Sequence, residues 1–286
     1  LGCANIAEKF CTAIAESGNA RVAAVASRSH SKALDFAAKH CRAAKAYGSY
    51  EELLQDTSIQ AVYIPVPTGL RTEIALKAAA AGKHILVEKP LVNKQELQSM
   101  VDACKSSGVQ FMDNTMFMHH NRQAAMHDVL EDTTFFSSGA KHVTATFSIP
   151  FGLQDAWAAE NIRMQKDLEP LGCLGDLGWY CVRFALWAFD YAEPCSISCS
   201  FLEQTPEGVP THALGQMRFE GGRTASIMCS FRAALYQSAE VVGDSCVLQL
   251  DDFVIPARKD SASFKVTKMG IGDKALTFPT EVVKQQ

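Results

Sequence analysis

Two side chains with acid–base chemistry lie four residues apart in the stretch "LGCLGDLGWYCVRFALWAF" (171–189). The stretch is glycine-rich at its start and then helical and apolar, so this spacing puts Asp176 and Tyr180 on one face of a helix. An acid and a phenol on the same side of an apolar helix predict an active site. A structural alternative stays open from these residues alone: the tyrosine hydroxyl borders a core, and the helix dipole favours an acid near the helix start.

A second charged group stands at the end of a short apolar strand. Residues 85–87 are Ile-Leu-Val, between Gly82 and Pro90, and they predict a buried strand that runs into Glu88 and Lys89. An ion pair closed by the proline would explain this ending as well as a functional site would. The rest of the chain has to distinguish the two interpretations.

The chain begins with small residues in the spacing of a nucleotide-binding turn. Gly2, Ala4 and Ala7 form a G-x-A-x-x-A array that is followed by a helical pattern of apolar residues. This array is a relaxed form of the G-x-G-x-x-G/A dinucleotide turn, although small residues are also common at helix starts. Only Leu1 remains of the strand that should precede the turn. We therefore expect the first strand to be mostly absent from these residues.

The end of the next predicted strand favours NADP over NAD. Residues 21–29 form the second strand of a βαβ unit, where an acidic residue would bind the adenine ribose of NAD. Here the strand ends in Ser27, Arg28 and Ser29, a guanidinium between two hydroxyls with no acid to repel a 2′-phosphate. The alternative is that Arg28 is an ordinary solvated loop residue.

Strands and helices alternate throughout residues 1–115, which predicts a parallel, doubly wound sheet. Ligands bind such sheets at the carboxyl ends of the strands. The polar or proline-stiffened residues that follow two of these strands are therefore placed at the predicted ligand edge: Pro65, Pro67, Thr68, Glu88 and Lys89.

The second half of the chain has a different pattern. In 143–149, 196–201 and 224–231, apolar residues alternate with residues that are mostly Ser or Thr. This pattern predicts strands with one apolar face in a largely antiparallel sheet, so the fold class is α/β followed by α+β. The other face carries small hydroxyls and almost no charge, which indicates a face covered by a second copy of the chain in a homodimer.

Composition limits the classes of function. The chain has 286 residues, 48% hydrophobic and 20% charged, with a net charge of -4, which is typical of a globular enzyme of two domains. The charge balance argues against nucleic acid and anionic membranes as partners, and no apolar stretch is long enough to span a membrane. Ten cysteines without a C-x-x-C pair favour a reduced, cytoplasmic setting, and the pair His119-His120 lacks further ligands at metal-binding spacing.

Together these motifs resemble the Gfo/Idh/MocA oxidoreductases, most of all their NADP-dependent sugar and dihydrodiol dehydrogenases. The resemblance covers essentially the whole chain and rests on the motifs at 2–7, 63–68, 88–90 and 175–180. It implies a Rossmann domain at 1–115 and a substrate-binding and dimerisation domain at 116–286. The family normally continues with a further strand and helix, so we expect the C-terminal end to be truncated at Gln286.

The resemblance also implies residue roles. Lys89 would lie beside nicotinamide and substrate, with a cis peptide bond to Pro90. Tyr180 stands where most of the family has histidine, and it would take a proton from a substrate hydroxyl while the Lys89 ammonium lowers the pKa of the phenol. Asp176 would bind substrate hydroxyls. The cofactor would contact Gly2, Ala4, Asn5, Ile6, Ser27, Arg28, Pro65, Pro67, Thr68, Glu88 and Lys89.

The resemblance, together with the NADP preference predicted from Arg28, therefore implies an NADP-dependent dehydrogenase of a sugar, a polyol or a cyclic trans-diol. The remaining candidates for substrate binding are His119 and Arg122, at the start of the second domain, and Arg163, whose segment the resemblance places near the substrate; hinge packing or a surface salt bridge is the alternative for each. Trp157, Trp179 and Trp187 could stack on a sugar ring, although core packing suits Trp187 better. The alternative function is a regulator that kept the dinucleotide-binding fold and lost the chemistry.

Overall fold

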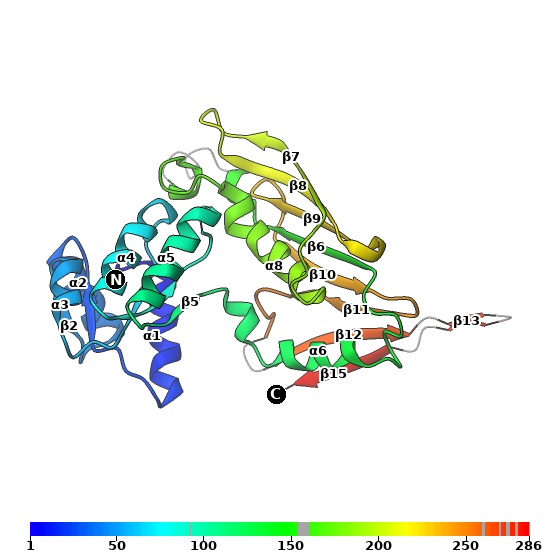
Figure 1. Cartoon of the computed structure of the whole chain (residues 1–286), viewed down its shortest axis with the longest axis horizontal. Coiled ribbons are helices and arrows are strands. Elements are labelled where there is room, and N and C mark those ends of the chain that lie inside the picture. Colours follow the sequence, from blue (N-terminus) through cyan, green and yellow to red (C-terminus); the bar gives the residue numbers. More distant parts are fainter. Residues whose placement is uncertain are drawn as a thin grey trace. The chain divides into compact units, whose positions relative to one another are not determined.

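The computed structural model divides the chain into two compact units, Leu1–Asn114 and Thr115–Gln286, drawn in Figure 1. The structure describes the backbone of residues 1–91, 93–153, 161–258, 261–268, 270–272, 275–277 and 280–285. Within these residues, every helix is too short or too polar to pass through a lipid bilayer. Each unit is built around strands of its own and is described by itself.

The first unit alternates strands with helices, and the parallel sheet predicted from this alternation is confirmed. Strand β1 pairs in parallel with β2, and β4 lies between β3 and β5, also in parallel. The strands are β1 (Ala24–Ala26), β2 (Lys45–Tyr47), β3 (Ala61–Ile64), β4 (His84–Val87) and β5 (Phe111–Asp113). The helices are α1 (Asn5–Ser17), α2 (His30–His40), α3 (Tyr50–Gln55), α4 (Arg71–Ala80) and α5 (Lys94–Ser106).

Local chemistry sets where these helices begin. The side chains of Ser29, Ser49 and Asn93 each accept a hydrogen bond from a backbone N–H of the first turn of α2, α3 and α5. After α4, Gly82 has φ +70, a left-handed conformation that glycine adopts without strain, and the chain then enters β4. These side chains and this glycine therefore set where α2, α3 and α5 begin and where the chain leaves α4.

A cavity of about 820 Å³ lies between the two groups of parallel strands. Its lining is mostly apolar and includes Phe10, Ile14, Val25 and Val62. At its end, the Leu1 amino group donates to the Tyr63 carbonyl (2.7 Å), and the Gly2 N–H donates to the Ala26 carbonyl (2.8 Å). The first two residues thus bridge β3 and β1 as a parallel strand between them would.

The second unit contains a long mixed sheet in the order β15-β12-β11-β10-β6-β9-β8-β7. Neighbouring strands are antiparallel except β6 and β9, which are parallel, so the prediction of a largely antiparallel sheet is confirmed. The strands are β6 (His142–Ser148), β7 (Ser196–Gln204), β8 (Pro210–Arg218), β9 (Thr224–Ser230), β10 (Tyr236–Val242), β11 (Cys246–Leu250), β12 (Ala262–Lys268) and β15 (Thr280–Gln285); β13 (Gly270–Gly272) pairs with β14 (Ala275–Thr277).

Helix α8 (Trp179–Ala188) packs on the apolar face of this sheet, against β6, β9 and β10. Helix α6 (Arg122–Glu131) packs on β12. The predicted alternation is seen in β6, where Val143, Ala145 and Phe147 are buried while Thr144 and Thr146 are half-buried. The core of the second unit therefore lies between α8 and the inner face of the sheet.

Strand β7 departs from the prediction of one buried face. All nine of its residues are exposed, including Ile197 at 68% and Phe201 at 47%. The reason is its position: β7 is the last strand of the sheet and pairs with β8 alone among the described strands. The alternating apolar residues of β7 therefore do not form a buried face among the described residues.

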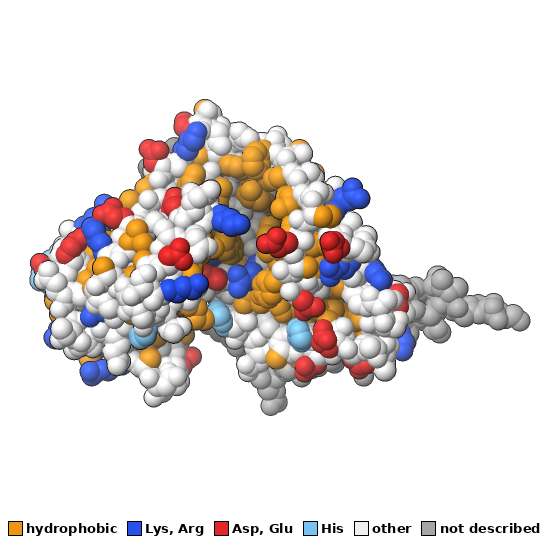
Figure 2. Space-filling model, viewed as in Figure 1, with side chains coloured by type: hydrophobic (Ala, Val, Ile, Leu, Met, Phe, Trp, Pro, Cys, Tyr) orange, Lys and Arg blue, Asp and Glu red, His pale blue; other side chains and the backbone are white. Residues whose placement is uncertain are grey.

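The surface charge matches the near-balanced composition. On the face shown in Figure 2, acidic and basic side chains are interspersed over the described residues rather than gathered into one large patch of a single sign. The Ser/Thr-rich outer face is less free of charge than expected, because Glu240 of β10 lies beside Thr144 and accepts its hydroxyl hydrogen bond at 3.5 Å.

Candidate active site

Asp176 lies in a π-helical turn, Leu174–Gly178, that leads directly into α8 and Tyr180. Such turns are rare and are frequently found at functional sites. Glycine is required in this stretch because the backbone runs against the sheet: a Cβ at Gly178 would lie 3.0 Å from Cys229 Sγ, and one at Gly172 would lie 2.2 Å from the Pro210 carbonyl oxygen. The glycine-rich start thus brings the acid and the phenol close to β8 and β9.

Arg163 and Asp176 form the central ion pair of this site, with 2.6 Å between Nε and Oδ2. The Arg163 guanidinium also lies over the Phe151 ring, 5.7 Å from its centroid. Burial opposes the charge of Arg163, but the Asp176 carboxylate and, more weakly, the Tyr180 phenolate raise the pKa of the guanidinium above its usual value. By reciprocity, the Arg163 charge favours the phenolate form of Tyr180.

The phenol ring of Tyr180 is fixed by packing. Its ring centroid lies 5.9 Å from that of Phe117 and 5.9 Å from that of Phe147, and the residue is 7% exposed. The preceding residue, Trp179, donates its indole N–H to Thr115 Oγ1 at 2.8 Å. This bond ties the start of α8 to the first residue of the second unit and leaves the indole half-buried rather than freely exposed.

The turn after β4 is anchored by Glu88. The carboxylate of this buried residue accepts hydrogen bonds from the Tyr63 hydroxyl of β3 and from Asn114 Nδ2 (2.6 Å), just after β5. Burial and the nearby carboxylate raise the pKa of the Tyr63 phenol far above its usual value, so the phenol stays a donor. The next peptide bond, Lys89–Pro90, is cis, as the family resemblance implies.

The predicted cofactor turn begins at Gly2, which has φ +98. A Cβ at this position would lie 3.2 Å from Val66 Cγ1, so the close approach of two loops also requires glycine. Ala4 precedes α1 without a side-chain cap, and Asn5 and Ile6 form the first turn of the helix. Uncapped N–H groups at a helix start bind phosphate, so this turn fits a dinucleotide.

Ser27, Arg28 and Ser29 connect β1 to α2. Arg28 is exposed, whereas Ser27 is buried and its hydroxyl accepts a hydrogen bond from the Ser29 N–H at 3.2 Å. The Ser29 and Ser31 hydroxyls lie 2.9 Å apart. The loop therefore presents one exposed cation with the half-buried Ser29 hydroxyl beside it, donors that suit a 2′-phosphate.

The loop after β3 is more buried than the sequence alone suggested. Pro65 and Thr68 are buried and Pro67 is half-buried. The hydroxyl-bearing residue Thr68, which starts a short 3₁₀ turn (Thr68–Leu70), is 1% exposed. Neither the hydroxyl nor the backbone of Thr68 is exposed here, so its contact with the cofactor stays a proposal.

Arg122, predicted to bind substrate, has structural contacts instead. It is 2% exposed, pairs with Asp252 Oδ1 at 2.6 Å and donates to the carbonyls of Asp252, Phe253 and Ser263. These bonds hold α6 against β12 and the preceding turn, in agreement with the packing alternative for Arg122. His119 is exposed at the end of a 3₁₀ turn, Met116–His119.

The three tryptophans differ in their surroundings. Trp187 is 7% exposed within the core, in agreement with the packing alternative. Trp157 lies outside the described residues.

Lys89 belongs to the first unit, whereas Asp176, Tyr180 and Arg163 are brought together in the second unit, so the pairing of Lys89 with Tyr180 stays a proposal.

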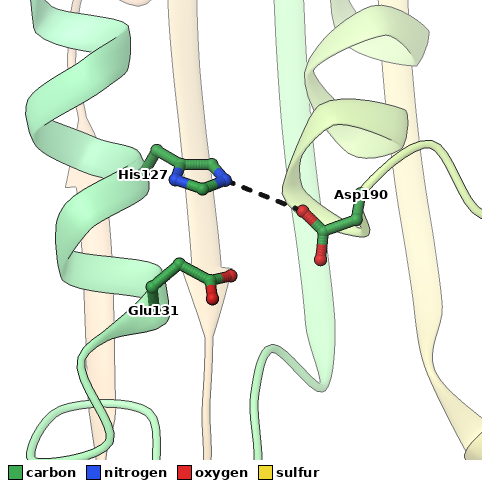
Figure 3. Close-up of side chains that lie close together, drawn as sticks. All are labelled: His127, Glu131 and Asp190. Atoms are coloured by element: carbon green, nitrogen blue, oxygen red, sulfur yellow. Dashed lines mark ion pairs between the residues drawn. The ribbon is translucent and has the colours of Figure 1, made fainter.

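A further group of potential metal ligands lies apart from these motifs. His127 and Glu131 project from α6 toward Asp190, which follows α8, as Figure 3 shows. His127 Nε2 and Asp190 Oδ1 are 3.8 Å apart, and both side chains are exposed, 47% and 74%. A surface ion pair with an acidic neighbour accounts for this group, and we assign no metal site to it.

Sequence reasoning missed the residues that support the site. Arg71, in the first turn of α4, is 6% exposed and binds the carbonyls of Val66 and Pro90. Tyr63 and Asn114 hold Glu88, as described above. The sequence position of Arg71 could have indicated its role, because it is a single arginine at the start of an alanine-rich helix, directly after the proline loop. Tyr63 and Asn114 gave no such signal, because their contacts connect strands that are far apart in the chain.

Comparison with known proteins identifies the family. The family described as "Oxidoreductase family, NAD-binding Rossmann fold" matches residues 1–115, and "GFO/IDH/MocA C-terminal domain" matches residues 140–249. D-xylose 1-dehydrogenase (NADP(+)) 2 of Haloferax volcanii is 32% identical over 232 residues, which cover 81% of this chain and 68% of the relative. Trans-1,2-dihydrobenzene-1,2-diol dehydrogenase of Mus musculus is 30% identical over 283 residues, 97% of this chain and 78% of the relative.

The fold agrees with a solved structure. The crystal structure of KijD10, a 3-ketoreductase from Actinomadura kijaniata in complex with NADP and TDP-benzene, superposes with a TM-score of 0.84. It shares 24% sequence identity, and the match covers 99% of this chain and 82% of that one. With matches at this level over both halves, the chain belongs to the Gfo/Idh/MocA family of oxidoreductases.

Proposed function

We propose that this protein is an NADP-dependent oxidoreductase that moves a hydride between the nicotinamide and a carbon bearing a hydroxyl in a sugar, a polyol or a cyclic trans-diol. The observation that carries the proposal is the cluster of Arg163, Asp176 and Tyr180, in which a packed phenol lies beside a half-buried ion pair. The NADP-dependent xylose and the dihydrodiol dehydrogenases among the relatives support the substrate class. A cytoplasmic location remains part of the proposal.

In the oxidative direction, Tyr180 accepts the proton of the substrate hydroxyl. Bound NADP⁺ supplies the hydride acceptor. As the O–H proton moves to the phenolate oxygen and the C–H hydride leaves, the carbon–oxygen bond becomes a carbonyl, and charge and atoms balance. Asp176 orients neighbouring substrate hydroxyls, and the cations of Lys89 and Arg163 stabilise the phenolate before the transfer.

The function is tested by measuring NADPH formation over a panel of aldoses, polyols and trans-diols, with NAD⁺ in parallel. Turnover of at least one of these substrates with NADP⁺ is the expected result. Tight NADP⁺ binding without turnover of any of them would favour the alternative, a dinucleotide-binding regulator of the same fold.

The cofactor preference is expected to depend on Arg28. Replacing Arg28 with alanine should weaken NADP⁺ binding by about 1.5–3 kcal/mol, the value of a charge-assisted hydrogen bond, and leave NAD⁺ nearly unchanged. Titration calorimetry with both dinucleotides measures this. The matched control is Arg21→Ala, an exposed arginine that precedes β1 rather than following it. Equal losses for the two cofactors would contradict the assignment.

We also propose a homodimer formed through the outer face of the second-unit sheet. Thr144, Thr146 and Ser226 on this face are half-buried, and Ser198 on β7 is exposed. Lysine at Thr146 and Ser198 would place charges into such an interface, so both variants should sediment as monomers. The control is Ser106→Lys, an exposed serine at the end of α5. If both variants keep the wild-type mass, this face is not the interface.

A further inference from the structure

Arg71 connects the two loops that flank the proposed nicotinamide end of the first unit. Its Nε donates to the Val66 carbonyl at 2.7 Å, in the loop after β3, and its Nη1 donates to the Pro90 carbonyl at 2.5 Å, in the turn after β4. We propose that Arg71 is a positioning residue that fixes the Lys89 turn relative to the cofactor loop. This inference rests on the proposed function, in which Lys89 takes part in proton transfer.

The chemistry of the side chain suits this role. A guanidinium presents several N–H donors in one rigid plane, so it can hold two acceptors at a fixed separation. Arg71 is 6% exposed, and burying its charge costs free energy that an apolar residue in the same helix position would not. The bonds to two different loops are what an apolar side chain would lack.

Lys89 is held from both sides. On one side, the Glu88 carboxylate is bound by Tyr63 and Asn114, which fixes the end of β4 to β3 and to the residue after β5. On the other side, the Pro90 carbonyl is bound by Arg71. The Lys89 backbone therefore lies between two anchored residues. Removing Arg71 releases one of these anchors and, with it, the link to Val66.

The expected consequence is kinetic. A displacement of about 1 Å at a reacting group can lower the rate roughly 10²-fold, because effective molarity depends steeply on geometry. Replacing Arg71 with methionine, which has a similar length and no donors, should therefore lower kcat by about 10- to 100-fold. The KM for the alcohol substrate should change much less, because Arg71 is buried and acts through the backbone carbonyls that it binds.

The test is a double-mutant cycle of Arg71→Met and Lys89→Met, assayed with the best substrate of the panel. If Arg71 acts through Lys89, adding Arg71→Met to Lys89→Met should cost little further rate. A merely structural role would multiply the two losses. Arg42→Met, an exposed arginine two residues after α2, is the control and should leave kcat unchanged.

A second measurement does not depend on turnover. Hydrogen exchange of the unliganded protein should increase in peptides that cover 65–70 and 86–91 in Arg71→Met, and not in peptides that cover α2. Arg71→Lys, which retains the charge but not the planar pair of donors, should give an intermediate result and keeps the test available if the methionine variant folds poorly.

The outcomes separate this inference from the proposed function. Normal kcat and normal exchange in Arg71→Met, together with a defective Lys89→Met, would overturn the positioning role and leave the function standing. Normal turnover in Lys89→Met would overturn both the Lys89 role and the inference that depends on it. Multiplicative losses in the double variant would reduce Arg71 to a stabilising residue.

Discussion

Replacing Tyr180 with phenylalanine should lower kcat by roughly 10²–10⁴-fold, the usual scale of general acid–base catalysis, while the affinity for NADP⁺ is retained. The substitution removes only the hydroxyl oxygen, and the ring contacts with Phe117 and Phe147 that fix the side chain stay in place. A lower kcat in a variant that keeps these ring contacts would therefore result from the missing proton acceptor rather than from altered packing. Stopped-flow and steady-state assays with the best substrate measure it.

Lys89→Met should lose comparable rate, and the double variant should lose much less than the product of the two losses, since the groups act as a unit. Tyr191→Phe and Lys94→Met are matched controls: Tyr191 is 50% exposed after α8, and Lys94 is exposed at the start of α5. Both should keep wild-type kcat. Near-normal turnover in Tyr180→Phe would contradict the proposed role of Tyr180 in proton transfer.

The pH dependence gives the sign of the electrostatic effect. Oxidation requires the phenolate of Tyr180, and a nearby cation lowers the pKa of the phenol. Removing the Lys89 charge should therefore raise the pH that is needed to form the phenolate, so that kcat reaches its maximum at higher pH. Arg163 interacts with Tyr180 as well, so Arg163→Met should move the profile in the same direction. An unchanged profile in both variants would leave the phenol pKa independent of these cations.

The parts of the fold that were predictable are those set by local periodicity. Alternating apolar residues such as Val143, Ala145 and Phe147 specify a strand with one buried face wherever a helix covers that face. The same alternation at Ile197 and Phe201 gave the wrong burial, because the position of a strand in the sheet order is a long-range property. No pattern within 196–201 shows that β7 lies at the edge.

In the candidate site, too, residues linked by local spacing were predictable and residues linked by long-range contacts were not. Asp176 and Tyr180 were found because their spacing along one segment already brings them together. The partner of Asp176 is 13 residues away, and Arg163 was proposed through the family resemblance rather than from spacing. Residues such as Tyr63 and Asn114 contribute through contacts 25 and 26 residues from Glu88, which only the folded sheet reveals.

Arg122→Met should destabilise the second unit while leaving substrate KM unchanged. The guanidinium is 2% exposed and its partner, the Asp252 carboxylate, is 19% exposed, so the substitution leaves a poorly solvated charge without its cation. Breaking a buried pair in this way costs about 3–5 kcal/mol, which corresponds to a fall in melting temperature of roughly 10 °C. Differential scanning calorimetry of the variant and wild type measures the loss.

The ion pair between Arg122 and Asp252 can be tested separately from the packing of the Arg122 side chain. Adding Asp252→Asn to Arg122→Met removes the uncompensated charge and should recover part of the lost stability, because an amide is less costly to bury than a carboxylate. Arg258→Met, an exposed arginine near the same turn, is the control. An Arg122→Met protein that melts like the wild type but has a raised KM would instead restore Arg122 as a substrate-binding residue, because a guanidinium that only packs the core cannot change substrate affinity without changing stability.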